Sequence, residues 1–253
     1  SKKIKDANGN AVVDVTVGQS VTVTNDVSAP TVTSVSSDQA AGTYGIGTVI
    51  PIKVTFSEVV NVGGTPTLEL ETGTTDATAA YASGTGTDTL IFNYTVAATH
   101  VATDLDYKAT TSLKLPTNSD TIRDNLSTNG TLTLATPGAA NSLGHNEAIV
   151  IDGVRPTFSG YAANAGTKTI TITASEVVTG TPDATDFTVT AGGSANTVTA
   201  AVVATNNNTS TITLTVQNMI QNNAVVTVTY DASSTDSKKI KDANGNAVVD
   251  VTV

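Results

Sequence analysis

The chain lacks cysteine and tryptophan and has one methionine among its 253 residues. Without cysteine no disulfide can support the fold, so stability must come from a buried core, a bound metal, or both. Positive charge is scarce as well, because 12 Lys and Arg accompany 22 Asp and Glu and the formal charge is −10. This balance argues against nucleic acid and anionic membranes as partners. No apolar run approaches the length of a membrane span, so we expect no direct membrane insertion.

Aromatic residues make up only 4% of the chain, and no helical period is sustained. Short apolar runs rich in Thr and Val are instead separated by Gly, Asn, Asp and Ser, which is typical of strands joined by tight turns. Ile170 and Ile172 alternate with Thr, as in a strand with one buried face. The regular spacing of turns predicts an all-β chain built from Greek-key sandwiches.

A long exact repeat links the two ends of the sequence. Residues Ser1–Val17 recur letter for letter as Ser237–Val253. A closed single domain has no use for such a duplication. It predicts that the chain is one period of a longer tandem array, in which each unit contacts its neighbours.

Within this period, two segments show the same order of features. Each begins with Asp, a short spacer, Pro and a strand, at residues 26–32 and 152–158. Each continues to a strand that ends in Ser-Glu-Val-Val, at residues 57–60 and 175–178. The recurrence of both features in the same order predicts two homologous modules.

Each module also closes with a related turn, which follows Ile122 in the first and Ile240 in the second. We therefore expect three parts: residues 1–27 as the tail strand of a preceding repeat, residues 28–153 as a long module, and residues 154–253 as a short one. The expected strands are 31–36, 48–57, 66–71, 77–82, 87–96, 106–114, 131–135 and 147–152, followed by 157–162, 168–174, 186–190, 197–204, 210–216, 224–230 and 247–253.

Several short sequence motifs resemble those of a known group of proteins. Pro-Thr-Val at 30–32, Thr-Phe-Ser-Glu-Val-Val at 55–60 and Ile-x-Asp-x-x-Gly-Asn-Ala at 240–247 resemble the bacterial immunoglobulin-like repeats of giant adhesins and S-layer proteins. The second module resembles the SWM-type repeat of large bacterial cell-surface proteins. The resemblance implies two tandem Greek-key immunoglobulin-like β-sandwich modules in a secreted, extracellular protein.

The turn Asp242-Ala-Asn244-Gly-Asn246 is the best candidate for a ligand site. Its oxygen-bearing side chains alternate along a Gly-containing turn, and Ca²⁺ prefers about six to eight hard oxygen ligands. A simpler interpretation is a turn held by hydrogen bonds from Asp and Asn to their own backbone. The residues alone leave both interpretations open.

Sandwich topology brings further carboxylates toward this turn. Glu176 ends the second strand of its module and Asp152 lies in the entering linker, so both should meet the 242–246 turn at one pole. Asp104 and Asp106 are expected to face Asp152 across the joint. Because clustered carboxylates repel and a divalent ion relieves the repulsion, the sequence predicts calcium at the joints. At the N-terminal end of the first module, the corresponding candidate ligands are Asp26, Glu58 and Asp124.

Other chemistry is sparse. His100 and His145 are the only histidines, and neither has a metal-ligand spacing, so we expect both to lie in surface loops. No Ser, His and Asp arrangement can be assembled, and no Gly-rich loop precedes a helix. We therefore expect that the protein is not an enzyme.

Taken together, these features predict a structural repeat of a large cell-surface or filament-forming protein, acting as a calcium-rigidified stalk or fibre. Its expected partners are neighbouring repeats of the same protein, or like chains arranged head to tail. The alternative is an adhesin module that recognises a glycan or a partner protein through loops at a module pole. An exposed patch of Tyr44, Tyr81 and Tyr107 would favour that alternative.

The first seventeen residues carry the final strand of a second module without the rest of that module. We expect this segment to be disordered, to lie along its own first module, or to complete the second module of a neighbouring copy in place of Ala247–Val253. Otherwise the array continues covalently, with Val253 followed by a sequence like Gly18–Asp26.

Overall fold

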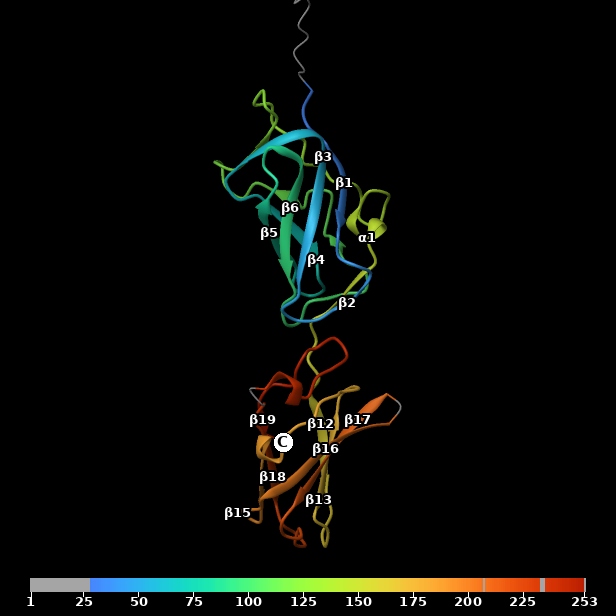
Figure 1. Ribbon diagram of the computed structural model, residues 1–253, viewed down its shortest axis with the longest axis vertical. Helices are drawn as coiled ribbons and strands as arrows, with labels where there is room; N and C mark the ends of the chain where they lie inside the picture. The colour runs from blue at the N-terminus through green and yellow to red at the C-terminus, as the bar shows by residue number, and fades with distance from the viewer. Residues whose placement is uncertain (1–27, 207, 233–234, 253) are drawn as a thin grey trace, which may run out of the picture.

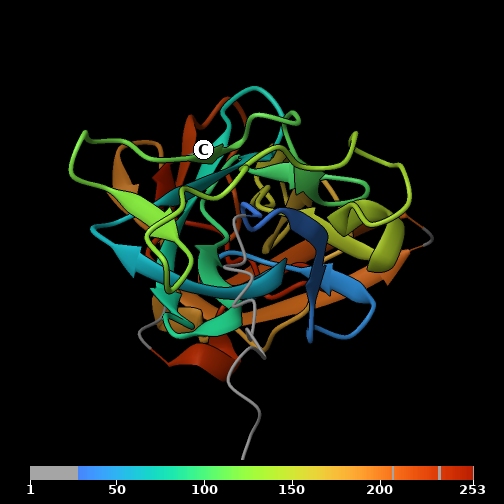
Figure 2. The ribbon, with the colours of Figure 1, turned by 90° about the horizontal axis from the view of Figure 1, so that it is seen from above.

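The structure is a computed structural model in which residues 28–206, 208–232 and 235–252 are described. Two β modules lie one above the other and are joined by a short connection (Figure 1). Viewed along the long axis, they overlap in projection (Figure 2). The predictions made for residues 1–27, including Asp26 as a ligand, fall outside the described residues.

The first module contains one large curled sheet and one small sheet. The large sheet has the order β1-β3-β6-β5-β4-β8, with β10 paired to β3 and β9 to β4, and the small sheet has the order β2-β11-β7. The elements are β1 (Val32–Ser37), β2 (Gly42–Tyr44), β3 (Val49–Gly63), β4 (Thr67–Glu71), β5 (Ala77–Ser83), β6 (Thr87–Thr95), β7 (Val101–Ala102), β8 (Asp106–Tyr107), β9 (Leu113–Lys114), β10 (Thr121–Arg123), helix α1 (Leu143–Asn146) and β11 (Ile149–Asp152).

The large sheet curls so that the strands at its two ends bury side chains in the same apolar core. Val35 of β1 and Tyr107 of β8 are at opposite ends of the strand order, yet both are buried in the same apolar cluster. The fifteen-residue β3 crosses the whole module, from Val49 near the second module to Gly63 at the far end (Figure 1). Alternate residues of β3 are buried from Ile50 to Phe56, as the period of a half-buried strand requires.

The second module is a sandwich of two four-stranded sheets, β12-β13-β17-β16 and β15-β14-β18-β19. With its seven main strands lettered A to G, the sheets read A-B-E-D and C-F-G, which is the order of immunoglobulin-type sandwiches. The elements are β12 (Phe158–Ala163), β13 (Thr169–Ala174), the 3₁₀ helix η1 (Ala184–Asp186), β14 (Phe187–Ala191), β15 (Ser194–Ala195), β16 (Val198–Asn206), β17 (Thr209–Val216), β18 (Val226–Tyr230), the 3₁₀ helix η2 (Asp236–Lys238) and β19 (Val251–Thr252).

The prediction of an all-β sandwich chain is confirmed. Several expected strands differ from the structure. Within the described part of 247–253, only Val251–Thr252 is a strand, and Ala247 forms an isolated bridge with Lys241. The stretch 106–114 is divided into β8 and β9 by a turn, and in 131–135 only Thr131 pairs, with Thr31. Helix α1 was not expected from the sequence, and Ser142 caps it by accepting the backbone N–H of His145 at 3.2 Å. None of the helices in the described part of the chain has the length and apolar character that a membrane crossing requires.

The two modules repeat the same corner. In the first, the N–H of Thr31 donates to Ser57 Oγ at 3.0 Å, and the N–H of Ser57 donates to Thr31 O at 2.8 Å. In the second, Thr157 and Ser175 make the same two bonds at 2.9 and 2.8 Å. The Ser-Glu-Val-Val motif therefore marks a structural position. Its serine bonds the start of β1 to β3 in the first module and the start of β12 to the end of β13 in the second.

Substitutions in the two cores should act separately, because the buried apolar residues form one cluster in each module. Ile52→Ala in β3 and Ile172→Ala in β13 each remove a fully buried side chain. Each is expected to lower the free energy of unfolding of its own module by about 2–5 kcal/mol. Calorimetry of the full chain should show two unfolding transitions. Ile52→Ala should lower the melting temperature of the first module only, and Ile172→Ala that of the second module only. Equal shifts of all unfolding signals by either variant would show that the modules unfold as one unit.

Candidate functional site at the joint between the modules

The connection between the modules is short and is fixed to the first one. β11 ends at Asp152 and β12 begins at Phe158. The N–H of Gly153 donates to His100 O at 2.7 Å, and the N–H of Thr99 donates to Gly153 O at 2.8 Å. A Cβ at Gly153 would lie 2.3 Å from Ala97 O, so only glycine fits between these backbones. The connection thus leaves the first module in a fixed direction.

The second module contributes the turn that contains Asp242. Its Oδ1 accepts the backbone N–H groups of Asn244 and Asn246, both at 2.8 Å. Its Oδ2 accepts the side-chain amide Nδ2 of Asn246, also at 2.8 Å. These contacts form an Asx-type turn that needs no other ligand to hold its shape.

The first module forms the same turn at its opposite end. Asp124 Oδ1 accepts the N–H groups of Leu126 at 2.8 Å and Thr128 at 2.7 Å. Burial works to raise the pKa of Asp124, but the hydrogen bonds from Thr128 and Leu126 outweigh burial, and the pKa is lowered. One aspartate therefore holds the equivalent turn in both modules.

Among the described residues, only the second turn bonds to the other module, and it does so through Asn244 and Asn246. Asn246 Oδ1 accepts the N–H of Ile46 at 2.7 Å, and its Nδ2 also donates to Asp152 O at 2.9 Å. Asn244 Nδ2 donates to Asp152 Oδ2 at 2.7 Å. The Asn246 side chain is only 1% exposed. We call Asn244 and Asn246, with Ile46 and Asp152, the amide clamp. The turn reaches the lower end of the first module in Figure 1.

Close backbone contact reinforces the amide clamp. Gly45, in the turn between β2 and β3, is buried against the Asp242 turn. A Cβ at this position would lie 2.1 Å from Asn244 O and 2.9 Å from Asn246 Oδ1. Arg155, in the connection, adds a hydrogen bond from Nη1 to Ala247 O at 3.0 Å. The two modules therefore meet through fitted polar surfaces as well as through a covalent link.

The structure brings together three of the predicted ligands, Asp152, Glu176 and Asp242. Partial burial, followed by the charges of Asp242 and Asp152, raises the pKa of Glu176. The smaller part of this shift, which comes from the two aspartates, is consistent with the convergence that the sandwich topology predicts. Asn244 and Asn246, also predicted as ligands, belong to the amide clamp in the same place.

Asp104 and Asp106 do not join this group. Val101 pairs with Asp152, and the N–H of Leu105 donates to Ile149 O at 2.7 Å, so the chain runs away from Asp152 along β11. Asp106 instead accepts the N–H groups of Tyr107 and Gly138, each at 2.8 Å. The expectation that these two carboxylates face Asp152 across the joint is therefore not met.

The predicted ligands of the first module lie away from the joint. Glu58 is in β3, and Asp124 follows β10, which pairs with β3 at the far end from the second module. Their position is equivalent to that of Glu176 and Asp242. The third member of that group, Asp26, is outside the described residues.

Within residues 28–252, leaving out the three undescribed positions, no group of three or more His, Cys, Asp or Glu is arranged to hold a metal ion. At the joint, Asp242 accepts N–H bonds on both carboxylate oxygens, and Asp152 accepts Val154 N–H on Oδ1 and Asn244 Nδ2 on Oδ2. The two asparagines direct amide nitrogens, and not oxygens, at these carboxylates. This donor set is that of a hydrogen-bonded joint, and calcium binding stays a prediction.

The tyrosines that would favour a binding module do not form an exposed patch. Tyr107 is fully buried, and its hydroxyl donates to Ala135 O at 2.7 Å. Tyr81 packs edge-on against Phe92, with ring centroids 5.9 Å apart. Neither side chain is available as part of a common aromatic platform.

The two histidines differ from each other. His145 is exposed, as expected. His100 is half-buried, and its Nδ1 lies 3.0 Å from Tyr94 Oη and accepts the N–H of Ala97 at 3.2 Å. The prediction of a simple surface residue is therefore wrong for His100, which shapes the turn that surrounds the connection.

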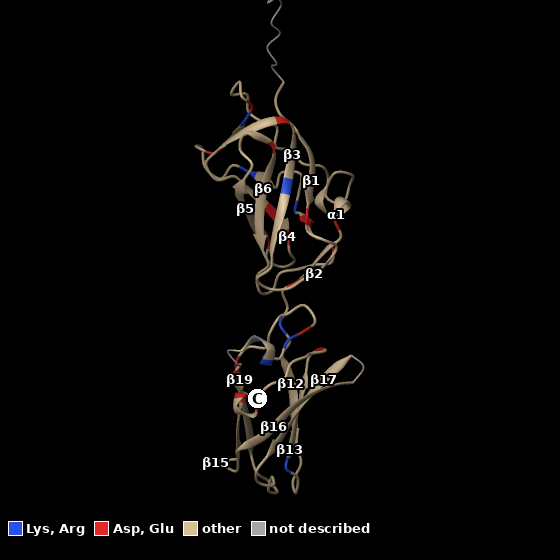
Figure 3. Ribbon diagram, viewed as in Figure 1, with Lys and Arg blue, Asp and Glu red and all other residues tan. Residues whose placement is uncertain are grey.

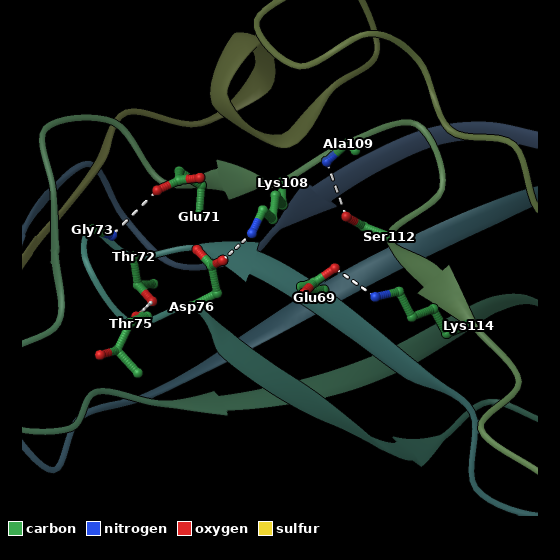
Figure 4. Close-up of polar contacts among 10 residues, drawn as sticks. All are labelled: Glu69, Glu71, Thr72, Gly73, Thr75, Asp76, Lys108, Ala109, Ser112 and Lys114. Carbon is green, nitrogen blue, oxygen red and sulfur yellow. Dashed lines mark hydrogen bonds and ion pairs between the residues drawn. The ribbon is translucent and has the colours of Figure 1, made fainter.

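The positions of Lys, Arg, Asp and Glu are distributed along the ribbons of both modules (Figure 3). On one face of the first module, Lys108 pairs with Asp76, and Lys114 pairs with Glu69 at 2.6 Å (Figure 4). Such exposed pairs contribute little to stability, because water and salt screen them. These two pairs therefore add little to the stability of the first module.

Comparison with known families adds one finding. Residues 179–235 match the SWM repeat, described as a "putative flagellar system-associated repeat". The match begins after β13 and includes β14 to β18, so the second module contains a repeat unit. A search of curated proteins gave no match to the chain. Fold and match together define the class as a β-sandwich repeat module.

Gly45→Ala should open the joint without unfolding either module. The added Cβ cannot fit against Asn244 O, and Gly45 has no left-handed backbone angle that alanine would strain. We expect the Ile46 amide to exchange with solvent about tenfold faster or more, because its bond to Asn246 is lost. Gly160→Ala is the matched control, since nothing lies within 4 Å of its Cβ position. Unchanged Ile46 exchange in Gly45→Ala would contradict the described contact.

Glu176 should make the second module less stable as the pH rises. Its pKa in the native state is raised above the ordinary 4.5, so the native state binds the proton more tightly than the unfolded state. Stability is then greatest below about pH 4.5 and falls as the pH rises through the raised native value. Glu176→Gln is expected to remove this dependence and to stabilise the module at neutral pH by up to about 1 kcal/mol. Thermal unfolding across pH measures both effects, with Glu58→Gln at the equivalent position of the first module as control. A steeper pH dependence in Glu176→Gln would refute the assignment.

Proposed function

We propose that the chain is a structural repeat of a large secreted cell-surface or filament-forming protein, and that its role is mechanical and not enzymatic. The observation that carries the proposal is the amide clamp, in which a side chain that is 1% exposed bonds both modules at once. A stalk must keep its modules in line, and buried polar contacts are satisfied in one arrangement only. The joint therefore transmits orientation from one module to the next.

The duplicated sequence extends this argument along an array. Asp242, Asn244 and Asn246 recur as Asp6, Asn8 and Asn10 within the identical segment. The same side chains would then be present wherever a second module follows a first. A joint that repeats in this way gives a long chain the same geometry at every period.

The other type of joint, from a second module into a first, has different chemistry. The Asp124 turn carries Leu126 and Thr128 where the Asp242 turn carries Asn244 and Asn246. Leu126 is 59% exposed. Without amides at these positions, this turn cannot form an amide clamp, so the proposed array alternates clamped joints with joints of another kind.

The proposed location is outside the cell. The support is the resemblance of the modules to immunoglobulin-like repeats of large bacterial surface proteins. The description of the matched repeat associates it with flagellar systems, which suits a chain that works as part of an extended external assembly.

Calcium is a second element of the proposal, and the raised pKa of Glu176 favours it. Burial is the larger cause of that raised pKa, and the charges of Asp242 and Asp152 add to it, so a divalent ion would relieve the repulsion among the three carboxylates. Such an ion would add to a joint that the amide clamp already orders.

The test compares Asn246→Ala with Thr128→Ala, its counterpart in the first module, in calcium and in chelator. Small-angle scattering of the wild-type chain should fit one extended arrangement, and Asn246→Ala should broaden the range of interdomain angles while Thr128→Ala does not. A bound ion would raise the melting temperature of the second module by mass action. Identical melting and scattering in calcium and in chelator would remove calcium from the account. A wild-type chain that bends as freely as Asn246→Ala would contradict the structural role.

A further inference from the structure

The turn of the first module that binds Asn246 has a counterpart in the second module. Gly45–Thr48 and Asn164–Thr167 both end in Gly-Thr, and in each turn the threonine N–H donates to the carbonyl of the first residue at 3.2 Å. The glycine has a left-handed backbone in both turns, with φ of +88° at Gly47 and +76° at Gly166. The two turns therefore share one backbone shape.

The same bonds fix each turn to its own module. The N–H groups of Gly47 and Gly166 donate to the carbonyls of Val96 and Ile220, both at 2.8 Å. The N–H groups of Val96 and Ile220 donate back to the threonine that ends each turn, at 2.9 and 2.8 Å. Each turn is thus held against its module in the same way.

One position of this pair of turns is filled in the first module and open in the second. The N–H of Ile46 donates to Asn246 in the amide clamp. Ala165 holds the same position in its turn, where it is exposed, and its N–H has no acceptor within the described residues. The turn follows β12, which runs away from the joint. The second module therefore repeats, at its other end, the surface that the first module uses at the joint.

The loops around Ala165 form an uncharged surface. We call residues 164–167, 191–196 and 217–225 the distal pole. They are linked by hydrogen bonds between Ile220 and Thr167, Gly192 and Val225, and Asn196 and Asn218. None of these residues is charged, although 13% of the chain is. Met219 is 55% exposed and Val225 is 75% exposed. Exposed apolar side chains without charge are typical of the centre of a protein interface.

The opposite end of the molecule carries a turn that matches this surface. In the Asp124 and Asp242 turns, the aspartate N–H donates at 3.1 Å to the carbonyl of the residue four places later. That residue is Thr128 in the first module and Asn246 in the second. Thr128 therefore holds the position from which Asn246 binds Ile46, and a threonine hydroxyl can accept an N–H bond as an amide oxygen does.

We propose that the Asp124 turn of one copy of this chain binds the Asn164–Thr167 turn of a second copy. Thr128 accepts the N–H of Ala165, and Leu126 packs against the exposed apolar side chains of the distal pole. This contact rests on the structural role proposed above and gives the repeat its second kind of joint.

Two substitutions make this second joint apolar. At the first joint, a Cβ at Gly45 would lie 2.1 Å from Asn244 O, so the backbones touch. Asn164 occupies the position of Gly45 in the second module, so the backbones must stay further apart there. Leu126 occupies the position of Asn244 and is largely exposed, so it fills the wider gap with an apolar side chain.

The contact joins unlike surfaces of the two copies. The Asp124 turn and the distal pole belong to opposite ends of an elongated molecule (Figure 1). A contact between unlike surfaces is heterologous, and between opposite ends of a long unit it repeats along a line. The same contact therefore serves successive units of a fibre in head-to-tail order.

Disulfide trapping between two full-length chains tests the contact, because the chain has no cysteine of its own. Thr128→Cys in one chain and Ala165→Cys in the other should form a mixed disulfide under mild oxidation, since the two positions meet. The rate should be at least about tenfold higher than for Thr128→Cys with Val202→Cys. Val202 is the matched control, because it is 58% exposed in the middle of β16, away from both ends. Similar rates for the two pairs would overturn the proposal.

Leu126→Asp, introduced into the Thr128→Cys chain, tests the apolar part of the contact. It should slow trapping by Ala165→Cys about tenfold or more, whereas Val202→Asp in the same chain should leave the rate unchanged. Each rate is divided by the rate at which the same thiol reacts with a small soluble disulfide, which removes differences in thiol reactivity. Trapping that Leu126→Asp does not slow would contradict the packing of Leu126.

Exchange of the Ile46 amide, measured on the same samples, reports the amide clamp separately. Protected Ile46 without selective trapping would refute the second joint and leave the structural role standing. Rapid exchange of Ile46 in the wild-type chain would instead refute the structural role itself.

Discussion

The buried side-chain amide of Asn246 is the interaction on which the arrangement of the two modules depends. A buried amide must find partners, because an unsatisfied one costs about 1–3 kcal/mol. Asn246 finds them in its own turn, at Asp242, and in the first module, at Ile46 and Asp152. Since Asp242 fixes the turn, the amide can satisfy all three partners in one relative orientation only. The hydrogen bonds of this five-residue turn therefore determine how the two modules are oriented relative to each other.

The Asp124 and Asp242 turns differ at only two side-chain positions that bear on contact with a neighbouring module. Asp124 and Asp242 hold their turns with the same pair of backbone bonds. The difference lies in the side chains two and four residues later, which are Leu126 and Thr128 in one turn and two asparagines in the other. The shared backbone keeps each sandwich closed, and the variable side chains decide how a neighbouring module is engaged.

Much of this fold follows from local pattern. The alternation of Ile170 and Ile172 with Thr predicts β13, and the recurring Ser-Glu-Val-Val word predicts the duplicated corner, because both depend on neighbouring residues. Sandwich topology also predicts that Glu176 and Asp242 meet. The position of Asp104 and Asp106 could not be found in this way, since it depends on the pairing of Leu105 with Ile149 across the module. The contact between Asn246 and Ile46 could not be predicted from local pattern either, because the two residues are 200 positions apart in the chain.

The central claim is that the amide clamp makes the two modules one body. Backbone ¹⁵N relaxation measured on the wild-type chain, in chelator, tests it most directly, because it reports the tumbling of each module separately. The account predicts that a single anisotropic diffusion tensor, with its long axis along both modules, fits the residues of both. Two independent correlation times, one for each module, would contradict it.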